Sequence, residues 1–265
     1  MPELYEPIAV CDISKKNADH CAAKFHLKQS TTDPQAVINN PEVDVVFVLT
    51  SDDQHAIMAI AALQAGKHVM IEKPLTLSLP AAQRIADAEK DAPNGAKVFV
   101  GYMRRYAPSY VETFKREVAS IPRILYARSR DIVGPNPHFV GQSGTFPVKN
   151  TDFPAGASRE RDRLLDNLMQ ETFEDRPVTN EMRQYCRFLG SLGSHDLSLM
   201  RETLGFPESV ASVSVNDPFY TAMFNYKNEK SGEPFSVTYE SGIDAVPRFD
   251  AHLTVYGEKK TVSIQ

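Results

Sequence analysis

The stretch that decides the fold is residues 66–74, which read GKHVMIEKP. An alanine-rich segment, residues 56–65, precedes it and stops at Gly66, as helices commonly do at glycine. Residues 67–71 then predict a buried parallel strand, because they form a short apolar run bounded by turn signals. Glu72, Lys73 and Pro74 would therefore stand at the carboxyl end of a strand, which is where open α/β sheets bind ligands.

A lysine in that position has an apolar strand behind it and a crevice in front. Partial desolvation favours the neutral amine and would fit Lys73 for proton transfer. The alternative is an ordinary surface pair of Glu72 and Lys73 at a strand end, without a chemical role.

The surrounding sequence resembles the second half of the nucleotide-binding domain of the Gfo/Idh/MocA family, the relatives of glucose–fructose oxidoreductase and inositol dehydrogenase. The resemblance is carried by GKHVMIEKPL at 66–75, LTSDDQH at 49–55 and the alanine-rich segment between them, and it extends from about Ile8 to Gly205. It implies an NAD(P)-dependent oxidoreductase that acts on a CH–OH group of a sugar, polyol or related small molecule. In such an enzyme Lys73 would help to deprotonate the hydroxyl, and Glu72, Lys73 and Pro74 would lie at the cofactor.

The composition is that of an ordinary globular protein. The 265 residues are 42% hydrophobic and 24% charged, with a net charge of −5 that disfavours a nucleic-acid partner. No apolar stretch approaches the roughly 18 residues needed to span a bilayer, so we expect no membrane association. Cys11, Cys21 and Cys186 show no metal-ligand spacing, and the N-terminus has no signal-peptide pattern. We therefore expect a cytoplasmic protein with reduced cysteines and no metal site.

The first part of the chain alternates between strand-like and helix-like segments. The expected strands are 7–13, 45–49, 67–71 and 97–102, and the expected helices are 15–25, a turn at 30–34 leading to a helix that ends near 39, 54–65 and 79–91. This alternation predicts βαβ units and a parallel, doubly wound sheet. We assign residues 1–105 to a partial dinucleotide-binding, Rossmann-like domain of the α/β class.

Asp12 ends the first expected strand. An acid about 20 residues after the glycine-rich turn of a dinucleotide fold binds the adenosine ribose, and its charge favours NAD over NADP. The alternative for Asp12 is an acid at a helix N-terminus. Only 11 residues precede it, and the nearest glycine pair, Gly190 and Gly193, lies far downstream. We therefore expect an incomplete sheet, in a truncated form or a degenerate relative, and the missing turn counts against NAD binding by this chain.

Two further segments resemble the family's cofactor-binding parts. Thr50, Ser51 and His55 match a turn that lies against the cofactor, with Ser51 where proline is usual; Asp52 and Asp53 can equally complement a helix dipole. Residues 101–108, GYMRRYAP, resemble the boundary between the two domains. Arg104 there would bind a cofactor phosphate or a substrate carboxylate, or form a structural ion pair across the hinge.

The second part, residues 106–265, predicts an α+β substrate and oligomerisation domain. A helix at 110–119 and a strand within 121–133 precede a Gly- and Pro-rich segment, 134–156, which we expect to be a binding loop, and a charged segment, 158–175, which we expect to be a solvated helix. Alternating runs from residue 207 onward predict a mostly antiparallel sheet. Such sheets can pair between subunits, so we expect a homo-oligomer.

Residues 188–205 resemble the family's second catalytic signature. His195 matches the histidine that acts on the substrate hydroxyl, whereas Ser191 stands where the family has aspartate. A serine cannot hold an imidazolium as strongly, and Asp196 points about 100° around a helix from His195. His195 as a buried structural histidine is the alternative, and a non-catalytic binding or regulatory protein is the alternative for the whole chain.

Overall fold

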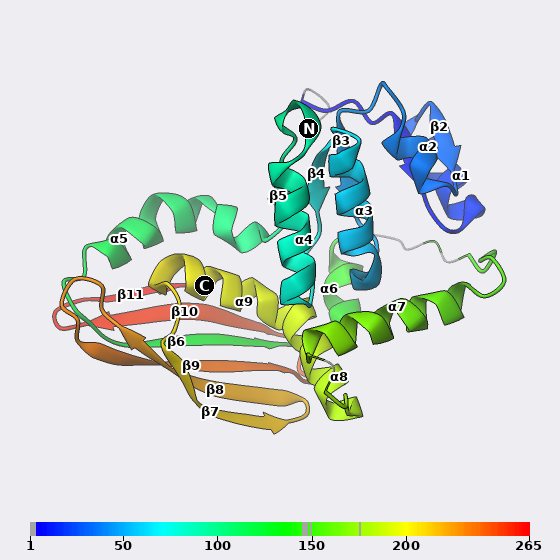
Figure 1. Cartoon of the computed structure of the whole chain (residues 1–265). Coiled ribbons are helices and arrows are strands. Elements are labelled where there is room, and N and C mark those ends of the chain that lie inside the picture. Colours follow the sequence, from blue (N-terminus) through cyan, green and yellow to red (C-terminus); the bar gives the residue numbers. More distant parts are fainter. Residues whose placement is uncertain (1–3, 145–147, 149, 175) are drawn as a thin grey trace. The chain divides into compact units, whose positions relative to one another are not determined.

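The computed structural model describes residues 4–144, 148, 150–174 and 176–265 (Figure 1). The chain forms two compact units, residues 1–101 with 147–183, and residues 102–146 with 184–265. The expected division, 1–105 and 106–265, differs in two places: it assigned the segment 147–183 to the second part and residues 102–105 to the first. The cofactor and substrate roles of the two parts stay predictions.

The first unit alternates strands and helices as expected. Its elements are β1 (Ala9–Cys11), α1 (Lys15–Phe25), β2 (Gln29–Thr31), α2 (Pro34–Ile38), β3 (Val45–Val48), α3 (Asp52–Gln64), β4 (His68–Ile71), α4 (Leu79–Lys90), the 3₁₀ turn η1 (Pro93–Gly95), β5 (Val98–Val100) and α7 (Ala157–Thr172). In the described residues β1 pairs with β2, and β3, β4 and β5 form a second sheet; every pair is parallel. The predicted parallel pairing of these strands is therefore confirmed, in two sheets rather than one.

Small side chains let α3 pack closely on the three-stranded sheet. Ala59, Ala62 and Leu63 of α3 are fully buried in a core that includes Val69 and Ile71 of β4. The chain leaves the helix at Gly66, two residues after Gln64, with a φ of 73° that is unfavourable for residues with a side chain. These contacts place the carboxyl end of β4, and the residues that follow it, at the edge of the sheet.

The second unit is built on a six-stranded sheet. Its elements are the 3₁₀ turn η2 (Met103–Tyr106), the π-helix η3 (Ser109–Phe114), α5 (Lys115–Ala119), β6 (Ile124–Val133), α6 (Asn136–Gln142), the π-helix η4 (Leu189–Gly193), α9 (Ser194–Leu204), β7 (Ser209–Asn216), β8 (Phe219–Lys227), β9 (Pro234–Ile243), β10 (Phe249–Gly257) and β11 (Thr261–Ile264). The order is β11-β10-β6-β9-β8-β7, and of the described pairs in this sheet only β6 with β9 is parallel. The predicted mostly antiparallel sheet is confirmed.

One face of this sheet carries the core. Alternate residues such as Val237 and Tyr239 of β9 pack against Tyr110 and Phe114 of η3 and Met200 of α9. In Figure 1 the helices α5 and α9 lie along this sheet. Helix α8 (Asn180–Phe188) begins in the first unit and ends in the second.

Three local expectations need revision. The helix expected at 110–119 is a π-helix followed by a short α-helix. The segment 134–156, expected to be a loop, contains α6; residues 145–147 and 149 lie outside the described residues. The charged helix α7 is not fully solvated, because Met169 is buried. Across the described ranges, no helix is long and apolar enough to cross a bilayer.

Candidate cofactor and catalytic residues

The turn after β3 presents two exposed hydroxyl-bearing residues. Thr50 and Ser51 lie two and three residues beyond the end of the strand at Val48, and Ser51 stands at the N-cap position of α3. The Ser51 hydroxyl donates to Oδ1 of Asp53 at 2.6 Å rather than capping the helix. This leaves backbone N–H groups at the start of α3 for other acceptors, which suits the neighbourhood of a polar ligand.

His55 lies beneath that turn and is only 1% exposed. Its Nδ1 lies 2.7 Å from the carbonyl oxygen of Pro74, and its Nε2 lies 3.1 Å from that of Thr50. The ring therefore bridges the turns that follow β3 and β4. A ring nitrogen could reach a ligand only by leaving one of these carbonyls, so the contacts indicate that His55 positions the turns, and direct cofactor contact by it stays a prediction.

Glu72, Lys73 and Pro74 follow β4 at the same level of the sheet as the turn after β3. The register pairs Val48 with Ile71, so Thr50 and Lys73 each stand two residues beyond a paired position. Oε2 of Glu72 accepts the Lys73 backbone N–H at 3.1 Å, and the Lys73–Pro74 peptide bond is cis. These residues therefore lie together at the carboxyl edge, as their sequence position predicts.

Asp12 follows β1 directly, and its carboxylate turns toward the next helix. Oδ1 accepts the Ser14 backbone N–H at 2.8 Å. Asp152 reaches the same helix terminus from the far end of the unit's sequence, where it accepts from the Ser14 hydroxyl at 2.5 Å and the Lys16 N–H at 3.0 Å. The contacts support the helix-terminus alternative for Asp12. No sequence pattern signals Asp152, because it contacts residues 136 or more positions away.

Arg104 lies within the second unit and contacts two acids there. Its Nη1 lies 3.0 Å from Oδ2 of Asp131 and donates to Oδ1 of Asp196, and its guanidinium lies 5.4 Å from the Phe249 ring centroid. A phosphate bound to this guanidinium would lie close to two carboxylates, whose negative charge opposes it. The contacts support the ion-pair alternative, although within one unit, and the cofactor role of Arg104 stays a prediction.

His195 lies in the first turn of α9, directly after η4. Its side chain is neither buried nor fully exposed, and its carbonyl accepts the Ser198 hydroxyl at 2.9 Å. Ser191 is exposed, and its hydroxyl donates to the Phe188 carbonyl at 3.2 Å. Ser191 thus bonds to its own helix and offers the histidine no carboxylate.

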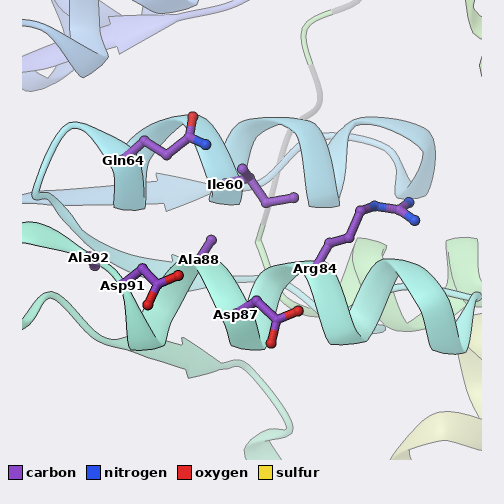
Figure 2. Close-up of a pocket in the computed structure, with 7 residues that line it drawn as sticks. All are labelled: Ile60, Gln64, Arg84, Asp87, Ala88, Asp91 and Ala92. Atoms are coloured by element: carbon purple, nitrogen blue, oxygen red, sulfur yellow. The ribbon is translucent and has the colours of Figure 1, made fainter.

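A separate groove runs between α3 and α4, with a volume of about 350 Å³. Figure 2 shows Ile60 and Gln64 of α3 on one side, and Arg84 and Asp87 of α4 on the other. Ile60 and Gln64 belong to the carboxyl-terminal half of α3, whereas the candidate residues lie at its amino end. This groove is therefore not the candidate cofactor site.

The residues present fit part of a dinucleotide. Thr50, Ser51 and the carboxyl end of β4 offer hydroxyls, free backbone amides and a lysine at a sheet edge, which suits the nicotinamide and its ribose. A pyrophosphate needs a close approach to backbone at a Gly-x-Gly-x-x-Gly turn, and no two of the 13 glycines stand two residues apart. The fit is good at the edge of the sheet and lacking for the pyrophosphate.

Comparisons with known proteins agree with this fold. Residues 1–102 match the sequence model of the GFO_IDH_MocA family, described as an oxidoreductase family with an NAD-binding Rossmann fold. The chain is 33% identical over 140 residues to scyllo-inositol 2-dehydrogenase (NAD(+)) of Bacillus subtilis, covering 52% of this chain and 40% of that protein. It is 30% identical over 173 residues to myo-inositol 2-dehydrogenase of Thermotoga maritima, covering 64% and 50%. The matches thus span half or less of these relatives.

Solved structures share the fold over almost the whole chain. Myo-inositol 2-dehydrogenase from Lactobacillus plantarum superimposes with a TM-score of 0.69 at 19% identity, covering 98% of this chain and 68% of that one. Scyllo-inositol dehydrogenase from Lactobacillus casei, solved with NAD(H) and scyllo-inositol, gives a TM-score of 0.69 at 18% identity, with coverage of 98% and 68%. At these identities the likeness shows the fold alone.

Proposed function

We propose that this chain, whose residues 1–102 match the Gfo/Idh/MocA oxidoreductase family, takes part in NAD-dependent oxidation of a CH–OH group on an inositol, sugar or related polyol. The observation that carries the proposal is the edge at which Thr50, Ser51, Glu72 and Lys73 follow neighbouring parallel strands. The names of the relatives supply the substrate class. Three free cysteines are consistent with action in the cytoplasm.

Oxidation of such a group removes a hydride from carbon and a proton from oxygen. A bound nicotinamide supplies the hydride acceptor. In this proposal the amine of Lys73 orients the hydroxyl and helps to remove its proton, and His195 acts as acid/base on the same proton. Asp12, Thr50, Ser51 and the edge at Glu72 and Pro74 bind the cofactor, with NAD favoured over NADP by the charge of Asp12.

The test compares this chain with a form extended at its N-terminus by the strand, glycine-rich turn and helix of an inositol dehydrogenase. NAD titration and reduction of NAD with myo-inositol, scyllo-inositol and glucose are measured for both. We expect tight NAD binding and turnover in the extended form. Lys73→Ala should lower its kcat/KM by 100-fold or more, and Asp12→Ala should weaken NAD binding by about tenfold. An extended form that folds but neither binds nor reduces NAD contradicts the proposal.

A second candidate is a non-catalytic binding protein of the same family. Ser191 favours it, because a hydroxyl bonded to the Phe188 carbonyl cannot support an imidazolium. The Ser191→Asp variant of the extended form distinguishes the two. A rise in kcat with Ser191→Asp from a measurable starting activity supports the enzyme, whereas polyol binding without turnover in both forms supports the binding protein.

We also propose that the chain forms homo-oligomers through the face of the six-stranded sheet opposite its core. Met223 of β8 pairs with Thr238 of β9, which pairs with Arg128 of β6, so these side chains share that face. Met223 is 42% exposed there. Light scattering after size exclusion should show a dimer or larger species, and Met223→Arg should shift it toward monomer; a monomeric wild-type chain at micromolar concentration contradicts the proposal.

A further inference from the structure

A guanidinium and two carboxylates meet inside the second unit. Arg104 comes from η2, Asp131 from β6 and Asp196 from the first turn of α9. The same nitrogen, Nη1 of Arg104, lies 3.0 Å from Oδ2 of Asp131 and donates to Oδ1 of Asp196. The two carboxylates are therefore neighbours around a single guanidinium nitrogen, and the three side chains join elements that are far apart in the sequence.

Both acids are withdrawn from water. Asp131 is 0% exposed and Asp196 is 4% exposed. Within the part of the chain that the structure describes, both oxygens of Asp131 and Oδ2 of Asp196 accept no hydrogen bond; the Arg104 contact with Asp131 has ion-pair distance without hydrogen-bond geometry. Two ionised carboxylates against one guanidinium would leave an uncompensated negative charge, which is strongly unfavourable in a buried place.

The other groups packed against the pair cannot balance that charge. Tyr239 and Ser241 of β9 bring hydroxyl groups, which are themselves buried and without hydrogen-bond partners among the described residues. Burial raises the pKa of Tyr239, so its phenol stays neutral. The described residues contain no cluster of three acidic, histidine or cysteine side chains suited to a metal ion. A proton bound to one of the two acids is the remaining way to neutralise this charge.

Burial raises the pKa of Asp196 well above its ordinary value, and the neighbouring Asp131 adds to this effect, against the opposing effect of Arg104. A proton on one acid also provides a hydrogen-bond donor to neighbouring carboxylate oxygens that otherwise accept no hydrogen bond. One carboxylate, one carboxylic acid and one guanidinium then sum to zero charge.

We propose that Asp131 and Asp196 hold one proton between them and, with Arg104, form a neutral clamp that fixes α9 on β6 and so positions His195. The clamp residues touch neither substrate nor cofactor in this proposal; they are positioning residues. The effect of the clamp on catalysis by His195 rests on the proposed function. The shared proton does not depend on that function. The structural control is on the same helix, where Glu202 forms exposed ion pairs with Arg105 and Lys115.

The first test is urea unfolding of the wild-type chain and Asp196→Asn between pH 5 and 9. An acid whose folded-state pKa is raised binds more protons folded than unfolded, so its contribution to stability falls as the pH rises. Asparagine keeps the shape of the protonated acid and cannot ionise. We expect the ratio of the unfolding constants, wild type over Asp196→Asn, to rise with pH by up to tenfold per unit. A ratio that stays constant over the whole range overturns the shared proton.

The second test measures the imidazole signals of His195 directly, by NMR of the chain labelled with ¹⁵N-histidine. We expect Asp196→Ala to shift the imidazole signals and the titration midpoint of His195, whereas Asp196→Asn and Glu202→Gln leave them near those of the wild type. A His195 signal unchanged by Asp196→Ala in folded protein overturns the positioning role. Neither test needs turnover, so an inactive wild-type chain counts against the proposed function alone.

Discussion

At the residue scale, His55 lies where the sequence predicts, but its contacts indicate a structural role rather than contact with a cofactor. The sequence places it near the cofactor edge, and the structure puts it there, but with both ring nitrogens on backbone carbonyls. A neutral imidazole has one N–H and can donate to only one of them at a time. The sequence could predict the position because strand ends and helix starts have local signals. It could not predict the partners, because backbone carbonyls carry no residue-specific pattern.

Replacing His55 tests this structural role. His55→Ala should lower the free energy of unfolding by about 2–4 kcal/mol, because it leaves a cavity and removes the hydrogen-bond partner of a buried carbonyl. Urea denaturation measures the loss, and His20→Ala, at an exposed position, is the matched control. If the two variants are equally stable, the ring does not hold the turns together.

At the element scale, the passage from η4 into α9 depends on a close contact at Gly193. A Cβ atom added there would lie 2.6 Å from the Tyr239 hydroxyl oxygen and 3.1 Å from Cδ2 of Leu189. Both distances are too short for a side chain without movement. The sequence indicated a helix that contains His195 and Asp196, whereas the reason for Gly193 is a contact with Tyr239, on a strand 46 residues later.

Gly193→Ala should therefore destabilise the chain by about 1–3 kcal/mol, since the buried tyrosine must move. Tyr239→Phe removes the oxygen in question, so the double variant should recover part of the loss in a double-mutant cycle. Gly141→Ala in α6, where no atom lies within 4 Å of the added Cβ, is the control and should be near neutral. Equal effects at both glycines would contradict the packing argument.

The face of the six-stranded sheet opposite its core carries a chain of ion pairs. Glu240 bonds to Arg128 and to Arg130 at 2.8 Å, and Arg130 continues to Asp250 at 3.0 Å. Burial pulls the pKa of Glu240 upward, but the two arginines together hold it below its ordinary value. A lowered folded-state pKa gives stability that is present above the unfolded pKa of about 4.3 and is lost as the pH falls.

Glu240→Gln should thus cost about 1–2 kcal/mol at pH 7, and the difference from wild type should shrink as the pH falls from 5 toward 3. Thermal unfolding at a series of pH values measures both trends. Glu258, whose ion pair with Arg123 is long and exposed, provides the control variant Glu258→Gln, which should change little. A Glu240→Gln deficit that persists at pH 3 would contradict the charge-based explanation.

At the scale of the whole molecule, the order of strands and helices was readable from the sequence, but the membership of the first unit was not. The segment 147–183 joins that unit through contacts such as Thr172 Oγ1 donating to the Leu77 carbonyl at 3.1 Å and Arg84 pairing with Glu171 at 2.9 Å. These partners are about 90 residues apart. The charge of α7 indicated a solvated helix, because composition does not reveal which neighbour covers its buried side.

The separation of the first unit into two parallel sheets predicts unequal local stability. Strand β4 has hydrogen-bonded neighbours on both sides and buried Val69 and Ile71, whereas β1 and β2 form a pair of three-residue strands. A two-stranded sheet is marginally stable by itself, and opening it exposes little apolar surface. Hydrogen exchange followed by mass spectrometry should therefore show faster exchange in 9–11 and 29–31 than in 68–71.

The comparison is internal, because all three segments belong to one unit and one sample. Equal protection would mean that the edges of the β1–β2 pair are covered in solution, and exchange at increasing protein concentration would then show whether a second copy covers them. If protection of β1 and β2 is low and does not depend on protein concentration, the edges of this pair are not covered by a second copy. Unpaired edges of a sheet are the places where a second copy of a chain can add a strand.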